Sequence, residues 1–373
     1  MNLEVKAIYD RLQDEISKLP LNEFLLSPEE EQSLRSQKIE GLIQKHINLV
    51  PPQIQKRLRD ELDFWGPLQE PMADESISEI IVNGPQSIWL ERQGKLERHT
   101  DFFFSDLSFR NCMDRLCHEA RTHLTVENPF SEGRFREFRV TLIGTELTGS
   151  DMHLSLRRHP KNPWTFERLQ QHQWCSPQML PLFQKIITER KNFLVIGPTG
   201  SGKTSVLNSF LGLLPAQERV VVIEDTSEIA LPNQASMKLL TRDDPQGILS
   251  SIDQTQLLKR SLRLRPDRLV MGEVRGAEAK DFLMALATGH AGSFGTLHAQ
   301  NAAQALIRLE MLIQMGAAQW GLSAIRRLIQ LSLDYVIVAG RNSNGQRELQ
   351  GIYRLCSLED HGFLLEAVTE KDF

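Results

Sequence analysis

One octapeptide constrains the fold more than any other part of the chain. Residues 197–204 read GPTGSGKT, directly after the apolar run NFLVI and directly before the run SVLNSFLGLL. A buried strand, a glycine-rich loop ending in Gly-Lys-Thr and a helix, in this order, form a phosphate-binding loop. The backbone N–H groups of such a loop and the positive end of the helix dipole surround a phosphate group. The sequence therefore predicts a parallel α/β sheet that binds a nucleotide at the carboxyl end of one strand.

The same loop predicts which side chains hold the nucleotide. Lys203 is expected to reach the β- and γ-phosphates of ATP, and the Thr204 hydroxyl to ligate Mg²⁺. ATP and Mg²⁺ are thus the predicted cofactors. The predicted nucleotide-binding residues are Gly197, Pro198, Thr199, Gly200, Ser201, Gly202, Lys203, Thr204 and Ser205.

Two further apolar runs end in carboxylates. The run VVVIED contains Glu224, and the run LVMGE ends at Glu273. Because ligands bind beyond the carboxyl ends of parallel strands, we expect both carboxylates to face the γ-phosphate and the attacking water. The chain has no NKxD motif to read guanine, and it carries an N-terminal half that a small-molecule kinase does not need. These features favour a motor ATPase over a GTPase or a kinase.

Two histidines lie in the glycine-rich stretch 288–299, which reads TGHAGSFGTLHA. They could coordinate a metal ion, but no cysteine and no obvious third ligand accompanies them. We therefore expect His298, together with His290, to sense the γ-phosphate.

Changes in the pattern of apolar, turn-forming and proline residues divide the chain into four segments. Residues 1–62 are expected to be helical, because Ser-Pro-Glu-Glu at 27–30 reads as a helix start and apolar residues then recur near helical spacing. Residues 63–159 show short alternating runs between turn signals, typical of a small α/β domain. Residues 160–177 hold three prolines and little periodicity, and are predicted to be a linker. Residues 178–373 alternate strands and helices, as a parallel sheet with crossover helices does.

Composition restricts the classes of function. The 373 residues include 43 Lys+Arg against 48 Asp+Glu, a net charge of −5, so a broad grip on DNA or RNA would need a local basic patch, and no stable nucleic-acid partner is expected. No apolar run approaches the roughly 18 residues of a spanning helix, and the N-terminus does not read as a signal peptide. The four cysteines show no CxxC pair and are expected to be free thiols. We expect a cytoplasmic protein that meets a membrane only through a partner.

Taken together, the motifs resemble a known family. GPTGSGKT, IEDTSEI and SLRLRPDRLVMGEVRGAEAKDFLMALATGHAGSFGTLHA match in order and spacing the Walker A, Asp, Walker B and His boxes of the type II/IV secretion ATPases. The strings GPLQEPMADESISEIIVNGPQSIWLERQGKLE, NAAQALIRLEMLIQMG and LDYVIVAGR resemble most closely the CpaF/TadA branch, which powers tight-adherence (Flp-type) pili. The resemblance covers roughly residues 60–355.

The resemblance implies an architecture and a mode of action. It implies a PAS-like N-terminal domain and a RecA-like ATPase domain, assembled as a homo-hexamer that lies, peripheral to the membrane, on the cytoplasmic face of the inner membrane. ATP hydrolysis would drive interdomain motion that acts on polytopic platform proteins to assemble or retract a pilus. A conjugation-type secretion ATPase shares all four boxes and stays an alternative, as do a RecA-like nucleic-acid motor and a nucleotide-gated scaffold without turnover.

The resemblance also implies that Glu273 orders the metal ion, and it implies roles for arginines. In this family, arginines of the N-terminal domain reach the nucleotide, and the matching positions here are Arg139 and Arg157. The stretch GRFREFRV also offers Arg134 and Arg136, which leaves open which arginine points inward. Arg275 stands at a family position as well and is expected to make a structural ion pair.

Overall fold

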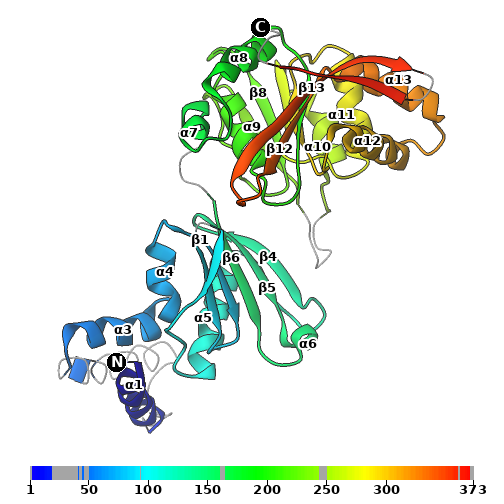
Figure 1. Cartoon of the computed structure of the whole chain (residues 1–373). Coiled ribbons are helices and arrows are strands. Elements are labelled where there is room, and N and C mark those ends of the chain that lie inside the picture. Colours follow the sequence, from blue (N-terminus) through cyan, green and yellow to red (C-terminus); the bar gives the residue numbers. More distant parts are fainter. Residues whose placement is uncertain are drawn as a thin grey trace. The chain divides into compact units, whose positions relative to one another are not determined.

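The chain folds as two compact units, residues 1–159 and 160–373 (Figure 1). The computed structural model describes residues 2–18, 41, 44, 45, 50–92, 94–159, 164–242, 250–359 and 362–369. The helix start predicted at 27–30 lies outside the described residues. Among the helices within these ranges, none is both long enough and apolar enough to cross a membrane.

The first unit combines short helices with one sheet. Its elements are α1 (Asn2–Ser17), α3 (Pro52–Asp63), η1 (Gly66–Leu68), α4 (Gln69–Ala73), β1 (Ile77–Asn83), β2 (Ile88–Arg92), β3 (Lys95–Arg98), α5 (Asp106–Glu119), β4 (Phe130–Phe135), β5 (Phe138–Ile143), α6 (Thr145–Thr148) and β6 (His153–Arg158). In the N-terminal segment, α1 and α3 pack together around Tyr9, Leu12, Leu58 and Phe104. This segment is thereby joined to the rest of the first unit.

A fully antiparallel sheet forms the body of this unit, in the strand order β3-β2-β1-β6-β5-β4. Side chains alternate along its strands, so that residues such as Ile80 and Val140 share one face and pack with Met113 of α5. The opposite face carries the more exposed side chains of the same strands, among them Arg139 and Arg157. The sheet is therefore apolar on one side and polar on the other, as alternation predicts.

The second unit is built on a larger, mostly parallel sheet. Its elements are α7 (Phe166–Gln171), η2 (Pro177–Met179), α8 (Leu180–Thr188), β7 (Phe193–Ile196), α9 (Lys203–Leu211), β8 (Val220–Glu224), β9 (Met237–Leu240), α10 (Gln254–Ser261), β10 (Arg268–Met271), α11 (Glu278–Ala287), β11 (Phe294–Leu297), α12 (Ala302–Gly316), α13 (Leu322–Ser332), β12 (Tyr335–Arg341), β13 (Arg347–Glu359) and β14 (Gly362–Ala367). The strand order is β14-β13-β12-β7-β11-β10-β8-β9. From β12 to β9 every pairing is parallel, whereas β13 and β14 extend the sheet as antiparallel hairpins.

Both faces of this sheet are covered, which explains its uninterrupted apolar strands. Leu194 and Ile196 of β7 belong to a core shared with α10, α11, α12 and α13, whereas Phe193 and Val195 belong to a core shared with α7, α8 and α9. Strands buried on both faces read as continuous apolar runs rather than as alternating ones. The α/β class and the RecA-like parallel sheet predicted for this part of the chain are confirmed by this arrangement.

The predicted linker, 160–177, differs from the structure over residues 164–177. Phe166 and Leu169 of α7 and the neighbouring Trp174 are buried in the core beside α8 and α9. A helix this short shows no repeating pattern in the sequence, and Pro177 is tolerated because it stands at the start of η2. The shortness of α7 and the proline explain why the sequence predicts a linker here. In the structure, this segment packs into the second unit.

Candidate nucleotide-binding site

The loop that follows β7 reverses the chain at the carboxyl edge of the parallel strands. β7 lies between β11 and β12, so the loop leaves the sheet beside the ends of both neighbours. Gly200 and Gly202 have φ of +74° and +90°, in the left-handed region that favours glycine. A Cβ atom on Gly197 would lie 2.1 Å from the carbonyl oxygen of Ala339. The shape of the loop therefore requires glycine at these three positions.

Lys203, the first residue of α9, folds back into the loop. Its Nζ donates hydrogen bonds to the carbonyl oxygens of Gly197 and Pro198, both at 3.0 Å. Burial lowers the pKa of this ammonium to about 8, and the charge of Glu273 opposes that shift. The loop thus supplies its own carbonyl oxygens to a poorly hydrated cation.

Hydrogen-bond donors gather within the loop. The N–H of Ser201 and the ammonium of Lys203 converge on the Pro198 carbonyl oxygen, at 3.3 Å and 3.0 Å. The Ser201 hydroxyl is buried and, within the described part of the chain, has no hydrogen-bond partner. Convergent donors around one acceptor form the kind of cradle that an anion occupies. The phosphate-binding role predicted for the loop is thus compatible with its geometry.

His298 links Lys203 to Glu273. Its Nδ1 lies 3.3 Å from the Lys203 Nζ, and its Nε2 lies 3.3 Å from Oε1 of Glu273. Burial, and then the charge of Lys203, lower the pKa of the imidazole, so it is neutral at pH 7. Because an ammonium can only donate, Nδ1 is the acceptor and Nε2 carries the proton, directed at the carboxylate. The structure therefore brings together three of the predicted site residues.

Glu224 lies at the expected edge of the sheet, but its carboxylate has other partners. Oε2 accepts the backbone N–H groups of Glu228 and Ile229, both at 2.9 Å, and Oε1 lies 3.2 Å from Nζ of Lys238. Burial raises the pKa of this carboxyl group, and Lys238 acts against the rise. In this structure the Glu224 carboxylate fixes the loop that follows β8, and its role toward the attacking water stays a prediction.

His290 is a clear correction. It lies before β11, and β11 runs parallel to β7 with Phe294 opposite Phe193. The start of β11 is therefore at the edge of the sheet opposite the phosphate-binding loop, where the backbone N–H of Gly292 donates to Asn192 at 2.8 Å. His290 cannot sense the γ-phosphate together with His298, because the length of the strand separates them.

The predicted arginines of the first unit form a row. Arg139 on β5 faces Arg157 on β6 and Arg134 on β4, so three arginines lie side by side on the exposed face of the sheet. Arg139 is paired with Glu132 at 2.8 Å. Arg136 does not join the row, because it has a φ of +52° in the β4–β5 turn and packs over the ring of Phe135. Like charges directly opposite each other are unfavourable, which makes the row a candidate anion site.

Other residues of the second unit complete the neighbourhood of the loop. Arg275 pairs with Asp225 at 2.5 Å, which confirms the structural ion pair expected for it. Arg341 and Arg347 contact the loop as well, through Gly200, and sequence reasoning missed both. The Asn-Gly dipeptide between them was an available signal, because it is a strong hairpin marker.

The part of the chain that the structure describes contains no ready-made metal centre. Within the described residues, no group of three or more His, Cys, Asp or Glu side chains could hold a metal ion. Mg²⁺ bound with a nucleotide does not need such a cluster, since it takes one or two protein ligands and completes its shell with phosphates and water. Thr204 in the first turn of α9 and Glu273 after β10 fit that requirement.

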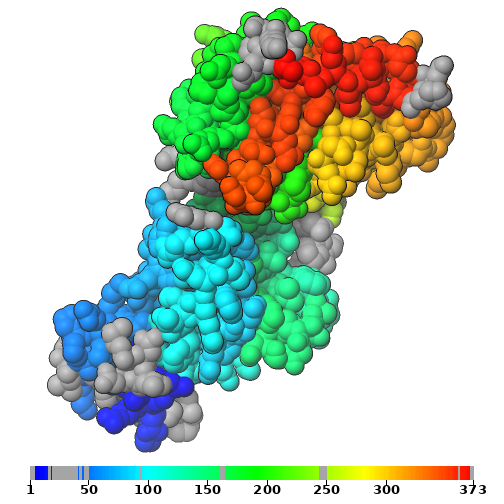
Figure 2. Space-filling view, in the orientation of Figure 1, coloured from blue at the N-terminus to red at the C-terminus, as the bar shows by residue number. Residues whose placement is uncertain are grey.

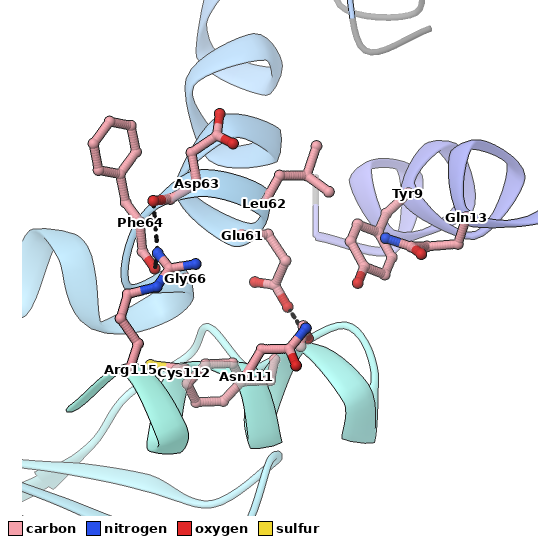
Figure 3. A pocket seen from close by; sticks show the side chains of 12 residues that line it. Tyr9, Gln13, Glu61, Leu62, Asp63, Phe64, Gly66, Asn111, Cys112 and Arg115 are labelled. Carbon is pink, nitrogen blue, oxygen red and sulfur yellow. Dashed lines mark hydrogen bonds between the residues drawn. The ribbon is translucent and has the colours of Figure 1, made fainter. Parts of the chain in front are cut away.

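A separate cavity of about 210 Å³ lies in the first unit, lined by residues of α1, α3 and α5 (Figure 3). The Glu61 carboxylate beside it accepts hydrogen bonds from Arg57 and from the backbone N–H of Phe104, both at 2.7 Å. Arg115 donates to the carbonyl oxygens of Asp63 and Phe64 (Figure 3). Because these polar groups satisfy one another, the cavity offers no evident chemistry.

The glycine-rich loop, the parallel strands and the Lys203–His298–Glu273 contacts define a P-loop NTPase of the RecA-like class. The family model described as type II/IV secretion system protein matches residues 65–341. The chain therefore belongs to the type II/IV secretion system ATPase family.

Individual relatives agree with this assignment. The chain is 30% identical to a putative conjugal transfer protein of Mycobacterium tuberculosis, over 84% of this chain and 89% of the relative. It is 38% identical to the type IV secretion system protein PtlH of Bordetella pertussis, over 73% of this chain and 88% of PtlH. The fold is similar to that of the Legionella pneumophila ATPase DotB, with a TM-score of 0.54 and 17% identity over 85% of this chain and 80% of DotB. These comparisons show the family, and they do not single out the tight-adherence branch.

The pKa of Lys203 predicts a pH dependence of nucleotide binding. The ammonium is charged below about pH 8 and loses its proton above it, so affinity for a non-hydrolysable ATP analogue is expected to fall about tenfold between pH 7 and pH 9. Since phosphate favours the charged form, binding at pH 9 should take up protons. Calorimetry in two buffers of different ionisation enthalpy measures both effects.

Glu273→Gln provides the internal check. Removing this negative charge lowers the pKa of Lys203 further, so the loss of affinity should begin at a lower pH than in the wild type. Lys259→Gln, a change on an exposed lysine of α10, should leave the profile unchanged. A flat affinity from pH 7 to pH 9 in the wild type would contradict the interpretation.

Proposed function

We propose that this chain is the cytoplasmic motor ATPase of an envelope-spanning secretion or pilus machine, and that it hydrolyses ATP bound at the loop 197–204. The contact of His298 with both Lys203 and Glu273 carries the proposal. It joins the phosphate-binding cation to a carboxylate that is one-third exposed and able to meet a water molecule. Membership of the secretion ATPase family supports the same conclusion.

Each residue of the contact has a part in the reaction. Lys203 exchanges the carbonyl oxygens of its own loop for the β- and γ-phosphates. Glu273 accepts the proton of the attacking water. Glu273 and Thr204 would hold Mg²⁺, which would neutralise charge on the phosphates. His298, neutral and donating from Nε2, orients the Glu273 carboxylate and responds when Lys203 moves. Glu224 keeps the loop after β8 in place.

The arginine row of the first unit is proposed to supply further positive charge to the nucleotide. Arg139 and Arg157 face each other across two strands, and an anion between them would relieve their repulsion. ATP would then draw the two units together, and loss of the γ-phosphate would release them. In a homo-hexamer this movement would be passed to membrane platform proteins. The support is the row itself and the family membership.

The relatives named above favour type IV secretion as the machine. PtlH and the conjugal transfer protein match most of this chain. Assembly of a tight-adherence pilus is the second candidate, favoured by the strings around 66–97 and 301–341 that resemble the CpaF/TadA branch.

The proposed chemistry predicts a separation of binding from turnover. Glu273→Gln is expected to bind a non-hydrolysable ATP analogue while its phosphate release falls about 100-fold or more, because an amide cannot accept the proton. Lys203→Ala should lose binding as well. Glu366→Gln, a matched change on the exposed strand β14, should keep wild-type turnover. Turnover of Glu273→Gln equal to the wild type would refute the assignment.

The proposed movement predicts a response to ATP that depends on the arginine row. Small-angle scattering of the wild type should show compaction with the ATP analogue and none with ADP. In the double variant Arg139→Gln/Arg157→Gln, compaction should disappear and turnover fall about tenfold or more. Arg110→Gln on α5, at an exposed position, is the control. A double variant that compacts as the wild type does would rule the row out, and a strict monomer in every state would rule out the ring.

The choice between the two machines is tested in the source bacterium. A deletion strain carrying Glu273→Gln should lose transfer of DNA or secreted protein to recipients while its surface pili, counted by electron microscopy, stay at wild-type numbers. Wild-type complementation should restore transfer. Loss of pili with intact transfer would replace type IV secretion by pilus assembly.

A further inference from the structure

The β12–β13 hairpin lies against the phosphate-binding loop. β12 pairs with β7 in parallel, with Val338 opposite Ile196, and then continues beside the loop that β7 enters. Arg341, the last residue of β12, is paired with Arg347, the first residue of β13. The space-filling view shows the orange-red hairpin at the surface of the second unit (Figure 2). Two arginines are thereby presented at the outer side of the loop.

Both guanidinium groups bond to the same backbone oxygen. Nη2 of Arg341 donates to the Gly200 carbonyl oxygen at 2.9 Å, and Nε of Arg347 donates to it at 3.0 Å. A Cβ atom on Gly200 would lie 3.2 Å from Nη2 of Arg341, and one on Gly202 would lie 3.2 Å from Cδ of Arg347. Two like charges therefore converge on a neutral acceptor at the tip of the loop.

The hairpin holds Arg341 in place. Its Nη1 donates to the Gly345 carbonyl oxygen at 2.9 Å, so the guanidinium is fixed at one end by the turn and at the other by the loop. The turn is closed by Asn342, whose side-chain oxygen accepts the N–H groups of Asn344 and Gln346 at 3.1 Å and 3.0 Å. A guanidinium anchored in this way loses little freedom when it bonds to the loop.

The peptide between Gly200 and Ser201 connects the outside of the loop to its interior. In a planar trans peptide the C=O and the following N–H point in opposite directions. Here the C=O is held from outside by the two arginines, and the N–H of Ser201 points inward to the Pro198 oxygen at 3.3 Å. Fixing the carbonyl therefore fixes the direction of the N–H.

We propose that Arg341 and Arg347 are positioning residues that keep the Ser201 N–H directed at the phosphates of a bound nucleotide. They act through the Gly200 carbonyl, which they also polarise, so that the N–H becomes a stronger donor. The inference rests on the proposed function, because it requires a nucleotide at this loop. It adds the β12–β13 hairpin to the elements that shape the site.

Two ligands separate this role from a contact with the base or ribose. We expect the double variant Arg341→Gln/Arg347→Gln to raise the Kd of ADP about tenfold and that of inorganic pyrophosphate by the same factor, since both use the loop. The variant Arg341→Lys/Arg347→Lys should recover part of the affinity, because an ammonium can still donate to the carbonyl. Calorimetry gives both constants, with Arg354→Gln, on the same strand and paired with Glu366, as the control.

The outcomes are distinct. Unchanged Kd values for both ligands in the Gln double variant would overturn the inference, and weaker ADP binding with unchanged pyrophosphate binding would replace it by a role in holding the nucleoside. A wild type that binds neither ligand would refute the proposed function itself. If the Gln double variant does not fold, the Lys double variant decides, because equal loss of both ligands supports the inference and wild-type binding overturns it.

Discussion

The parallel pairing of β7 with β11 on one side and β12 on the other is the constraint on which the site depends. Parallel strands end at the same edge, so this pairing places the loop after β7, His298 after β11 and Arg341 at the end of β12 beside one another. All four residues of β7 are fully buried. A slip of one residue would move Phe193 and Val195 into the opposite core and displace the loop, so the packing and the site are specified together.

The hydrogen-bond partners of the Lys203 ammonium are neutral groups. The Lys203 ammonium bonds to two carbonyl oxygens and to a neutral imidazole, none of which carries the negative charge that a phosphate brings. Burial already lowers the pKa of this lysine, which means that its charged form is held less well here than in water. Phosphate binding replaces weak acceptors by a strong one, and this difference favours the bound state.

The sequence predicts the parts of the site that are built by consecutive residues. It fails for the parts that depend on how distant segments pack together. Strand, loop and helix follow one another in the sequence, so Lys203 and Glu273 could be placed from motifs alone. The prediction for His290 was wrong, because the motif does not show at which end of β11 this histidine lies. Arg341 and Arg347 contact Gly200, which lies more than 140 residues earlier in the sequence. Only the register of the folded sheet brings these residues together. The sequence places Glu224 at the correct edge of the sheet, but it does not predict the partners of the buried carboxylate.

Net charge was a poor guide to where the cations lie. The chain carries a net charge of −5, yet Arg134, Arg139 and Arg157 form a row on one sheet, and two more arginines converge on the Gly200 carbonyl. Each set brings like charges together, and at ordinary ionic strength such repulsion is screened only beyond about 8–10 Å. The strands fix the positions of the three arginines of the row, and Arg139 also pairs with Glu132 at 2.8 Å. An anion between Arg139 and Arg157 would relieve their repulsion, which is the physical reason for proposing that the row acts on phosphate, whereas Arg341 and Arg347 are proposed to act through the Gly200 carbonyl.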